Sequence, residues 1–511
     1  MNESDKKYMD ESNKQIKIGA IISYTAIFIN VITSLIYLPW MTQKIGQANY
    51  GLYTLANSFV SMFLIDFGLS SAIARFLAKY RAEKNINKEN IVFAAVTKLY
   101  LVIDCGIFII LIIAYLFLDL IYKGLTPDEI QIFKQLYVVV AVFSIISFPC
   151  MSLNGIMTAH EKFIEAKICD LGQKLVSILL MIIALCNNLG VVAVVTANAV
   201  SGVLFIIVKI FLVNRNTKVR FDFLLKDKKV TKEILSFSIW TAISSICQRF
   251  YFSFAPTILG IVSNSHEIAV FSPANALEGY FYMFAAAVNG LFLAKISRYI
   301  AEDKEDRIYS LMVKIGRYQL FVMGLIFIGY ICIGHEFIIQ WMGKDYEKAY
   351  YCGIFLFIPD LLGFTQQIGN TTIIAKNKVK PSAIGYLIST IVCVILSFYL
   401  SRIWGSIGAS IAIAVGYFIA FLNANRIYYK YLNIPIFDFF KECFGTFIVP
   451  DVLSIIIGIF IQRNIIIKGW LGIGVKGFLL TLVYFILTLC FSLNTDERSI
   501  MRKIVVHIRR K

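Results

Sequence analysis

Long uninterrupted apolar runs recur along the whole chain and constrain its fold more than any other feature. The hydrocarbon core of a bilayer is roughly 30 Å thick, so a helix needs about 20 apolar residues to cross it. The sequence supplies such runs repeatedly, separated by short polar loops. Strands of a membrane barrel would be about 10 residues long and alternate in polarity. The runs therefore predict transmembrane helices.

Composition supports the same interpretation, because 58% of the 511 residues are hydrophobic and only 16% are charged. A water-soluble exterior cannot be built from that balance. We expect an all-α polytopic membrane protein with about 14 transmembrane helices. The predicted segments are 18–40, 50–74, 91–118, 135–158, 168–187, 191–213, 233–262, 269–294, 313–334, 350–374, 382–400, 406–424, 442–461 and 470–492.

The net charge of +17 follows the positive-inside rule. If the N-terminus is cytoplasmic, most of the 49 Lys and Arg fall in or beside inner loops and tails. Nucleic acid is therefore not an expected partner, and both termini are expected in the cytoplasm. The first segment is too long for a signal-peptide core and is expected to be retained. The ten cysteines and four histidines are scattered, so neither a metal site nor a cofactor is expected.

Weak internal similarity divides the chain into two halves. The motif Lys79-Tyr80-Arg81-Ala82-Glu83 after the second segment resembles Arg298-Tyr299-Ile300-Ala301-Glu302 after the eighth. We expect two six-helix bundles around a central cavity, followed by two C-terminal helices. The predicted parts are an N-terminal tail (1–17), a first lobe (18–213), a basic linker (214–232), a second lobe (233–424), two additional helices (425–492) and a basic tail (493–511).

Polar side chains interrupt several of the apolar segments, where a charge at mid-bilayer is costly and marks functional positions. In segment seven Arg249 lies close to mid-membrane, and we expect it to bind an anionic headgroup. The alternative is a buried pair between Arg249 and Glu278 that locks two helices together. The expected cavity-lining residues are Asn30, Ser34, Tyr37, Asn57, Thr241, Ser245, Gln248, Asn275, Glu278 and Tyr282.

Three carboxylates are candidates for gating or ion coupling: Asp66, Glu278 and Asp360. Helical geometry places Asp66 near Ser70, so it is a candidate for contact with neighbouring backbone or a partner helix. Asp360 follows Pro359, which frees backbone groups that polar neighbours can satisfy. No catalytic set is recognised.

The tract Gly46-Gln47-Ala48-Asn49-Tyr50-Gly51-Leu52-Tyr53, followed by Asp66-Phe67-Gly68-Leu69 and Arg75, resembles the polysaccharide transporter (lipid-linked oligosaccharide flippase) family. That family belongs to the superfamily that includes multidrug and toxin extrusion transporters and lipid II flippases. The resemblance implies an alternating-access flippase that moves a polyprenyl-pyrophosphate-linked oligosaccharide to the outer leaflet of the bacterial cytoplasmic membrane. Its implied partners are the glycolipid and membrane lipid, with a proton or sodium ion and glycan assembly proteins as candidates.

Two other functions compete with this interpretation. A cation-coupled small-molecule or drug exporter of the same superfamily would favour carboxylates and aromatic residues over a midplane arginine. A membrane-embedded glycan polymerase or ligase would need a substantial outer loop with catalytic groups. The longest outer connections, about 119–134 and 335–349, lack a paired acid and base, so a non-enzyme is expected.

Overall fold

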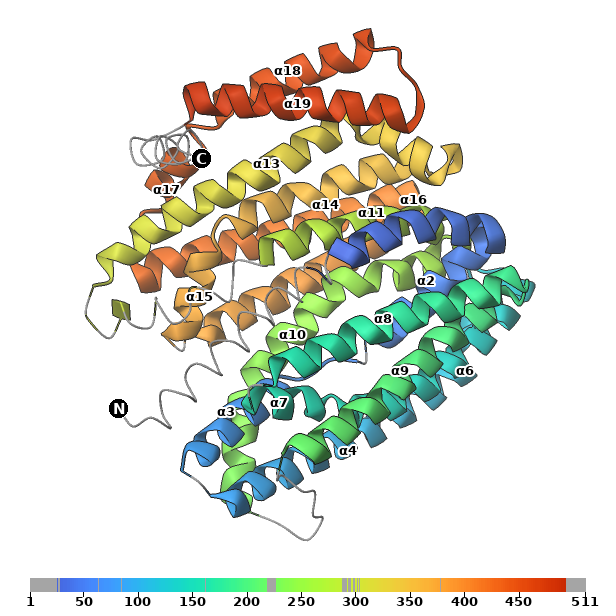
Figure 1. Cartoon of the computed structure of the whole chain (residues 1–511), viewed down its shortest axis with the longest axis vertical. Coiled ribbons are helices and arrows are strands. Elements are labelled where there is room, and N and C mark those ends of the chain that lie inside the picture. The colour runs from blue at the N-terminus through green and yellow to red at the C-terminus, as the bar shows by residue number, and fades with distance from the viewer. Residues whose placement is uncertain are drawn as a thin grey trace, which may run out of the picture. The chain divides into compact units, whose positions relative to one another are not determined.

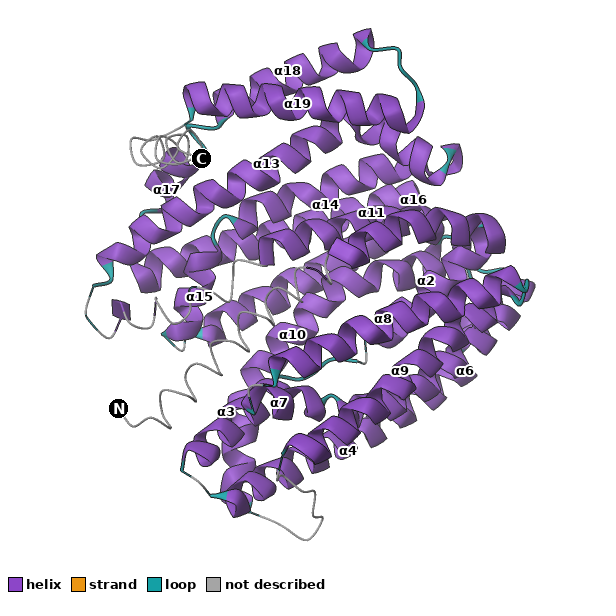
Figure 2. Ribbon diagram, viewed as in Figure 1, coloured by secondary structure: helices purple, strands orange, loops and turns teal. Residues whose placement is uncertain are grey.

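The computed structural model describes residues 25 and 28–492, apart from 63, 84, 161, 218–226, 377 and most of 287–303. Within these ranges the regular elements are helices, with no strand among them (Figure 2). Seven helices are long and apolar enough to cross a membrane, and two bent helix pairs raise the number of such spans to as many as nine. The predicted all-α polytopic membrane fold is confirmed.

The chain forms two compact units. The N-terminal unit contains residues 1–272 and 386–409, and the C-terminal unit contains residues 273–385 and 410–511. The predicted six-helix lobes 18–213 and 233–424 rest on sequence similarity and stay a prediction.

The N-terminal unit begins with a helix over residues 28–45. Its other helices are α2 (Gln47–Ser61), α3 (Leu69–Ala82), α4 (Ile86–Leu116), α5 (Leu118–Ile121), α6 (Pro127–Cys150), α7 (Ser152–Ala159), α8 (Phe163–Cys186), α9 (Gly190–Asn216) and α10 (Lys228–Val262), with parts of α11 (Ser265–Ala286) and α16 (Val379–Leu432).

The C-terminal unit contains the rest of α11 and α16. Its other helices are α13 (Asp306–Met342), the 3-10 helix η2 (Lys344–Tyr346), α14 (Lys348–Phe364), α15 (Gln367–Ala375), α17 (Ile436–Cys443), α18 (Ile448–Asn464) and α19 (Gly469–Phe491). Helices α13, α18 and α19 pack against one another (Figure 1).

The second predicted segment, 50–74, is not one continuous helix. Helix α2 ends at Ser61 and α3 begins at Leu69. Between them Phe67 and Gly68 adopt positive φ angles of 49° and 70°, which an α-helix cannot contain. The prediction of an unbroken span was wrong here, because apolarity alone does not report backbone direction.

Two other predicted segments are bent, and a local break separates two more. Helices α14 and α15 meet at a 54° bend, and α17 and α18 meet at a 46° bend. The predicted spans 350–374 and 442–461 are therefore bent pairs. Conversely, the helical run α16 contains Gly405 at φ 55° and ψ −129°, which separates the predicted segments 382–400 and 406–424.

A carboxylate fixes the turn at Gly405. The Glu267 carboxylate accepts hydrogen bonds from the Ser406 backbone N–H (2.8 Å) and hydroxyl (2.6 Å). A Cβ at Gly405 would lie 2.4 Å from the Glu267 carboxylate. Only glycine therefore fits the backbone angle and leaves room for this cap.

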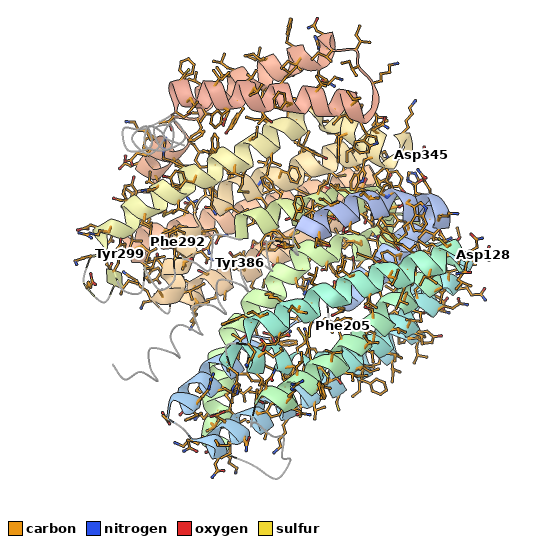
Figure 3. All side chains as sticks on the ribbon, viewed as in Figure 1. Asp128, Phe205, Phe292, Tyr299, Asp345 and Tyr386 are labelled. Atoms are coloured by element: carbon orange, nitrogen blue, oxygen red, sulfur yellow. The ribbon has the colours of Figure 1, made fainter. Side chains whose placement is uncertain are left out.

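Helices α8 and α9 approach closely because glycine lies in their contact. A Cβ at Gly172 of α8 would lie 2.6 Å from the Phe205 ring of α9 (Figure 3). Likewise, a Cβ at Gly202 of α9 would lie 2.3 Å from the Phe143 ring of α6. Such small-residue contacts are typical of helix packing in membranes, and here they join α6, α8 and α9.

Candidate functional site

The N-terminal unit contains a cavity of about 390 Å³, and nine of its thirteen lining residues have polar side chains. Its walls come from residues 28–45, α2, α8 and α9 (Figure 1). The polar residues of the lining are Thr33, Ser34, Tyr37, Tyr53, Asp170, Gln173, Lys174, Ser177 and Asn198. Hydroxyl, amide and aromatic groups of this kind match the surface of a sugar, which also combines hydroxyl groups with apolar faces.

Two of the predicted cavity residues, Ser34 and Tyr37, lie in this lining. The Ser34 hydroxyl donates to the side-chain oxygen of Asn30 at 3.4 Å, so Asn30 and Ser34 lie on one face of their helix. The Tyr37 hydroxyl is buried without a hydrogen-bond partner among the described residues.

Lys174 is the cation of this cavity, and it is not among the site residues predicted from the sequence. It lies near the middle of α8 and is exposed to the cavity. Within the described part of its unit no carboxylate forms an ion pair with it. A signal was present in the sequence, because Asp170, Gln173, Lys174 and Ser177 share one face of a helix at the spacing i, i+3, i+4, i+7.

The carboxylate of Asp170, close to Lys174 in the sequence, already interacts with two other lysines. Asp170, one turn before Lys174, pairs with Lys209 of α9 at 2.8 Å and lies 3.9 Å from Lys167. Lys209 also donates to Asn154 of α7 at 3.1 Å. The four charges of this cluster, including Lys174, sum to a positive excess on one side of the cavity.

A second cavity, of about 270 Å³, shares Asn198 with the first. The predicted residue Asn57 lines it together with Ser61 and Leu64. The guanidinium of Arg249 on α10 donates to the Leu64 carbonyl oxygen at 3.5 Å, a long and weak hydrogen bond. Because Leu64 lines the second cavity, Arg249, the predicted headgroup residue, lies next to its wall. The Arg249 side chain is exposed.

The break between α2 and α3 is held by Asp66. Its carboxylate accepts from the Ser70 backbone N–H at 3.1 Å, which caps the start of α3. The Tyr100 hydroxyl of α4 also donates to it. The Ser70 hydroxyl donates to the Met151 carbonyl oxygen at 3.1 Å, which joins the same cluster to the end of α6.

In the C-terminal unit the predicted residues Glu278 and Asp360 meet. Glu278 on α11 is 4% exposed and Asp360 on α14 is 3% exposed, and their carboxyl groups lie close enough to interact. Two buried carboxylates in contact repel each other, so a proton shared between them would stabilise the pair. Glu278 Oε1 and Asp360 Oδ2 have no further partner among the described residues.

The remaining predicted residues divide into two groups. Asn275 is half-buried on α11, and Tyr282, 38% exposed, packs its ring edge against Phe364 at 5.2 Å. The side chains of Thr241, Ser245 and Gln248 lie outside the described residues. The alternative Arg249–Glu278 pair would span the two units and stays a prediction.

His160 lies between α7 and α8, outside the membrane-spanning helices. His160 Nε2 is 3.8 Å from the Glu89 carboxylate. Burial, together with the positive charges of Arg81 and Lys162, lowers the pKa of His160 to about 4. Its imidazole is therefore neutral at physiological pH, despite the nearby carboxylate.

Solved membrane transporters share this fold. A structure of the lipid II flippase MurJ in an inward closed conformation superposes with a TM-score of 0.72, at 14% identity over 92% of this chain and 97% of that one. An inward-facing multidrug resistance MATE family transporter gives a TM-score of 0.64, at 15% identity over 79% of this chain and 96% of that one. A superfamily transporter from Pyrococcus furiosus gives 0.57, at 16% identity over 81% and 93%.

Sequence comparison gives the family. No curated protein sequence matches the chain. The model of a family described as polysaccharide biosynthesis protein matches residues 16–292, more than half of the chain. With the polytopic helical fold and the polar cavity of its N-terminal unit, the chain belongs to this polysaccharide biosynthesis protein family.

Proposed function

We propose that the protein is a flippase that moves a polyprenyl-pyrophosphate-linked oligosaccharide from the inner to the outer leaflet by alternating access. The proposal rests mainly on the cavity of 390 Å³ around Lys174, whose hydroxyl, amide and aromatic groups suit a bound sugar. The family's link to polysaccharide synthesis and a fold shared with a lipid II flippase support it. The protein would work in a bacterial cytoplasmic membrane, with both termini in the cytoplasm and glycan assembly proteins as partners.

The cavity offers a glycan the hydrogen-bonding groups that the hydrocarbon core of the membrane lacks. A glycan cannot cross hydrocarbon unaided, because its hydroxyl groups would lose their hydrogen bonds to water. Side chains such as Gln173, Ser177 and Asn198 replace those bonds inside the membrane. The lipid tail can remain in the bilayer throughout.

Two cations suit the charged part of the cargo. Lys174 and Arg249 form no salt bridge with a carboxylate in the described part of their unit, so a phosphate or an acidic sugar would not have to displace one. Outward movement of about two negative charges across an inside-negative potential of 100 mV releases roughly 4–5 kcal/mol. The membrane potential alone therefore favours export of the headgroup.

Ion coupling would add to this driving force, and the Glu278–Asp360 pair is our candidate for it. A pair that shares a proton can release and rebind it when hydration changes. Glu278→Gln fixes one member in a neutral form, so transport would lose its dependence on a pH gradient. Flipping that keeps the same dependence in this variant would exclude the pair. Asp66 is our candidate for gating, through the break between α2 and α3.

The two competing functions have less support. A drug exporter fits the shared MATE-type fold, but a lysine facing a polar cavity is better suited to an anion than to a cationic drug. A glycan polymerase or ligase is disfavoured because the solved proteins with this fold are named as flippases and transporters.

The direct test is flipping of a fluorescent lipid-linked oligosaccharide in proteoliposomes. We expect a severe loss with Lys174→Gln and Arg249→Ala, and partial recovery with Lys174→Arg and Arg249→Lys. Lys134→Gln is the matched control, because this lysine pairs with Asp119 outside the cavity at 2.7 Å. Normal flipping by folded Lys174→Gln and Arg249→Ala proteins would refute the anion site.

A further inference from the structure

Four buried oxygen atoms in the C-terminal unit have no part in the proposed transport path. They are Asp451 Oδ1, Ser454 Oγ, Tyr484 Oη and Thr488 Oγ1, and none has a hydrogen-bond partner among the described residues. The Ser454 and Tyr484 side chains are fully buried, and Thr488 is 2% exposed. Buried polar atoms are almost always satisfied in native proteins, so this group needs an explanation.

The four atoms come from two packed helices. Asp451 and Ser454 lie one turn apart on α18, and Tyr484 and Thr488 lie one turn apart on α19, which packs beside it and against α13 (Figure 1). The two helices run antiparallel, and a Cβ at Gly458 of α18 would lie 2.9 Å from the Leu480 side chain of α19. This register sets Ser454 level with Tyr484, and Asp451 level with Thr488. The Tyr484 hydroxyl faces α13, where a Cβ at Gly324 would come within 2.9 Å of it.

The two aliphatic hydroxyls make no hydrogen bond to their own helices. A Ser or Thr inside a helix usually donates to the carbonyl four residues earlier. Thr481 does so on α19, with its hydroxyl 2.8 Å from the Gly477 carbonyl oxygen. Thr488 and Ser454 make no such bond. Their lone pairs and those of Tyr484 are therefore free to act as ligands.

The cluster contains one carboxyl group, that of Asp451, and no ion pair to it occurs in the described part of its unit. Two cations on the packed helices have other partners: Arg317 donates to the Ser492 carbonyl oxygen at 2.5 Å, and Lys476 pairs with Glu336 at 2.5 Å. The Asp451 side chain is half-buried and its Oδ1 is enclosed, so ionisation of this carboxyl group calls for a cation beside it.

We propose that Asp451, Ser454, Tyr484 and Thr488 bind a sodium ion that joins α18 to α19. Carboxylate and hydroxyl oxygens are hard ligands and suit a hard cation. A single carboxylate balances a single positive charge, whereas calcium takes six to eight oxygen ligands and magnesium retains several waters. The inference stands independently of the transported substrate.

The test uses purified full-length protein, with sodium exchanged for choline or potassium at constant ionic strength. We expect one bound ²²Na⁺ per chain at this site and a thermal midpoint that rises with sodium concentration. Asp451→Asn should abolish both effects, and the near-isosteric Tyr484→Phe and Thr488→Val should weaken sodium binding at least several-fold. Asp438→Asn, an equal charge change on exposed α17, and Glu278→Gln should keep both effects.

Three results would overturn the proposal. Identical unfolding in sodium and choline would show that no ion stabilises the cluster. Loss of the sodium effect in Glu278→Gln, with retention in Asp451→Asn, would assign the ion to the other carboxyl pair. Stabilisation by acid alone, abolished by Asp451→Asn, would show that a proton satisfies the carboxylate.

Discussion

The Asp66 cluster predicts that the break in the second span depends on one carboxylate. Asp66 receives the Ser70 backbone N–H and the Tyr100 hydroxyl at once. Asp66→Ala removes the acceptor of both hydrogen bonds, and Asp66→Asn keeps one oxygen acceptor without the negative charge. Tyr100→Phe removes only the hydroxyl that donates to Asp66. These three variants separate the cap from the contact between helices.

The magnitudes follow from the two bonds. Loss of a helix N-cap costs about 1 kcal/mol, and a hydrogen bond to a charged group contributes about 1.5–3 kcal/mol. Asp66→Ala should therefore lower the free energy of unfolding by about 2.5–4 kcal/mol. Tyr100→Phe should cost about 1.5–3 kcal/mol, and Asp66→Asn should cost less than Asp66→Ala.

A double-mutant cycle on purified protein would test the assignment. Unfolding of Asp66→Ala, Tyr100→Phe and the double variant should give a coupling energy of at least about 1 kcal/mol, because both variants delete the same bond. Coupling energies within about 0.5 kcal/mol of zero would refute the reasoning. If Asp66→Asn loses flipping with little loss of stability, the residue acts in gating as well as in structure.

Three further outcomes follow from contacts outside the proposed path. Glu267→Ala should destabilise the protein by about 1–3 kcal/mol, since it leaves the Ser406 N–H unsatisfied, and equal thermal midpoints would contradict this. Because the pKa of His160 is lowered in the folded protein, its neutral imidazole should give its full contribution to the free energy of unfolding above about pH 6.5, and this contribution should be lost as the pH falls toward 4. His160→Gln should flatten the plot of unfolding free energy against pH in this range, and an unchanged slope would contradict the prediction. Lys476→Met should destabilise the protein more than the double variant with Glu336→Gln, because the single change leaves an unpaired carboxylate; the reverse order in urea unfolding would be contrary evidence.

The spans could be predicted from sequence because a bilayer imposes one length on every helix that crosses it. Each predicted segment coincides with a helix or a helix pair in the described residues. The breaks could not be predicted in the same way. Phe67 and Gly68 leave the helix through positive φ angles, and a phenylalanine in an apolar run carries no sign of this.

The candidate site was only partly predictable, for a related reason. Helical periodicity correctly grouped Ser34 with Tyr37, and placed Asp66 near Ser70, because both are relations within a few turns. Lys174 was missed although its polar face was visible, since only the packing of α8 against α9 shows that this face borders a cavity. The contact of Glu278 with Asp360 joins distant segments that no local pattern connects.

The gap between α2 and α3 affects how the charge of Arg249 is held. An unbroken helix would use the Leu64 carbonyl within its own ladder, whereas the gap leaves that oxygen able to anchor a guanidinium. A carbonyl has no net charge, so the anchor orients the arginine without quenching its field. Since the anchor is also long and weak, an arriving phosphate would outcompete it without having to break an ion pair first.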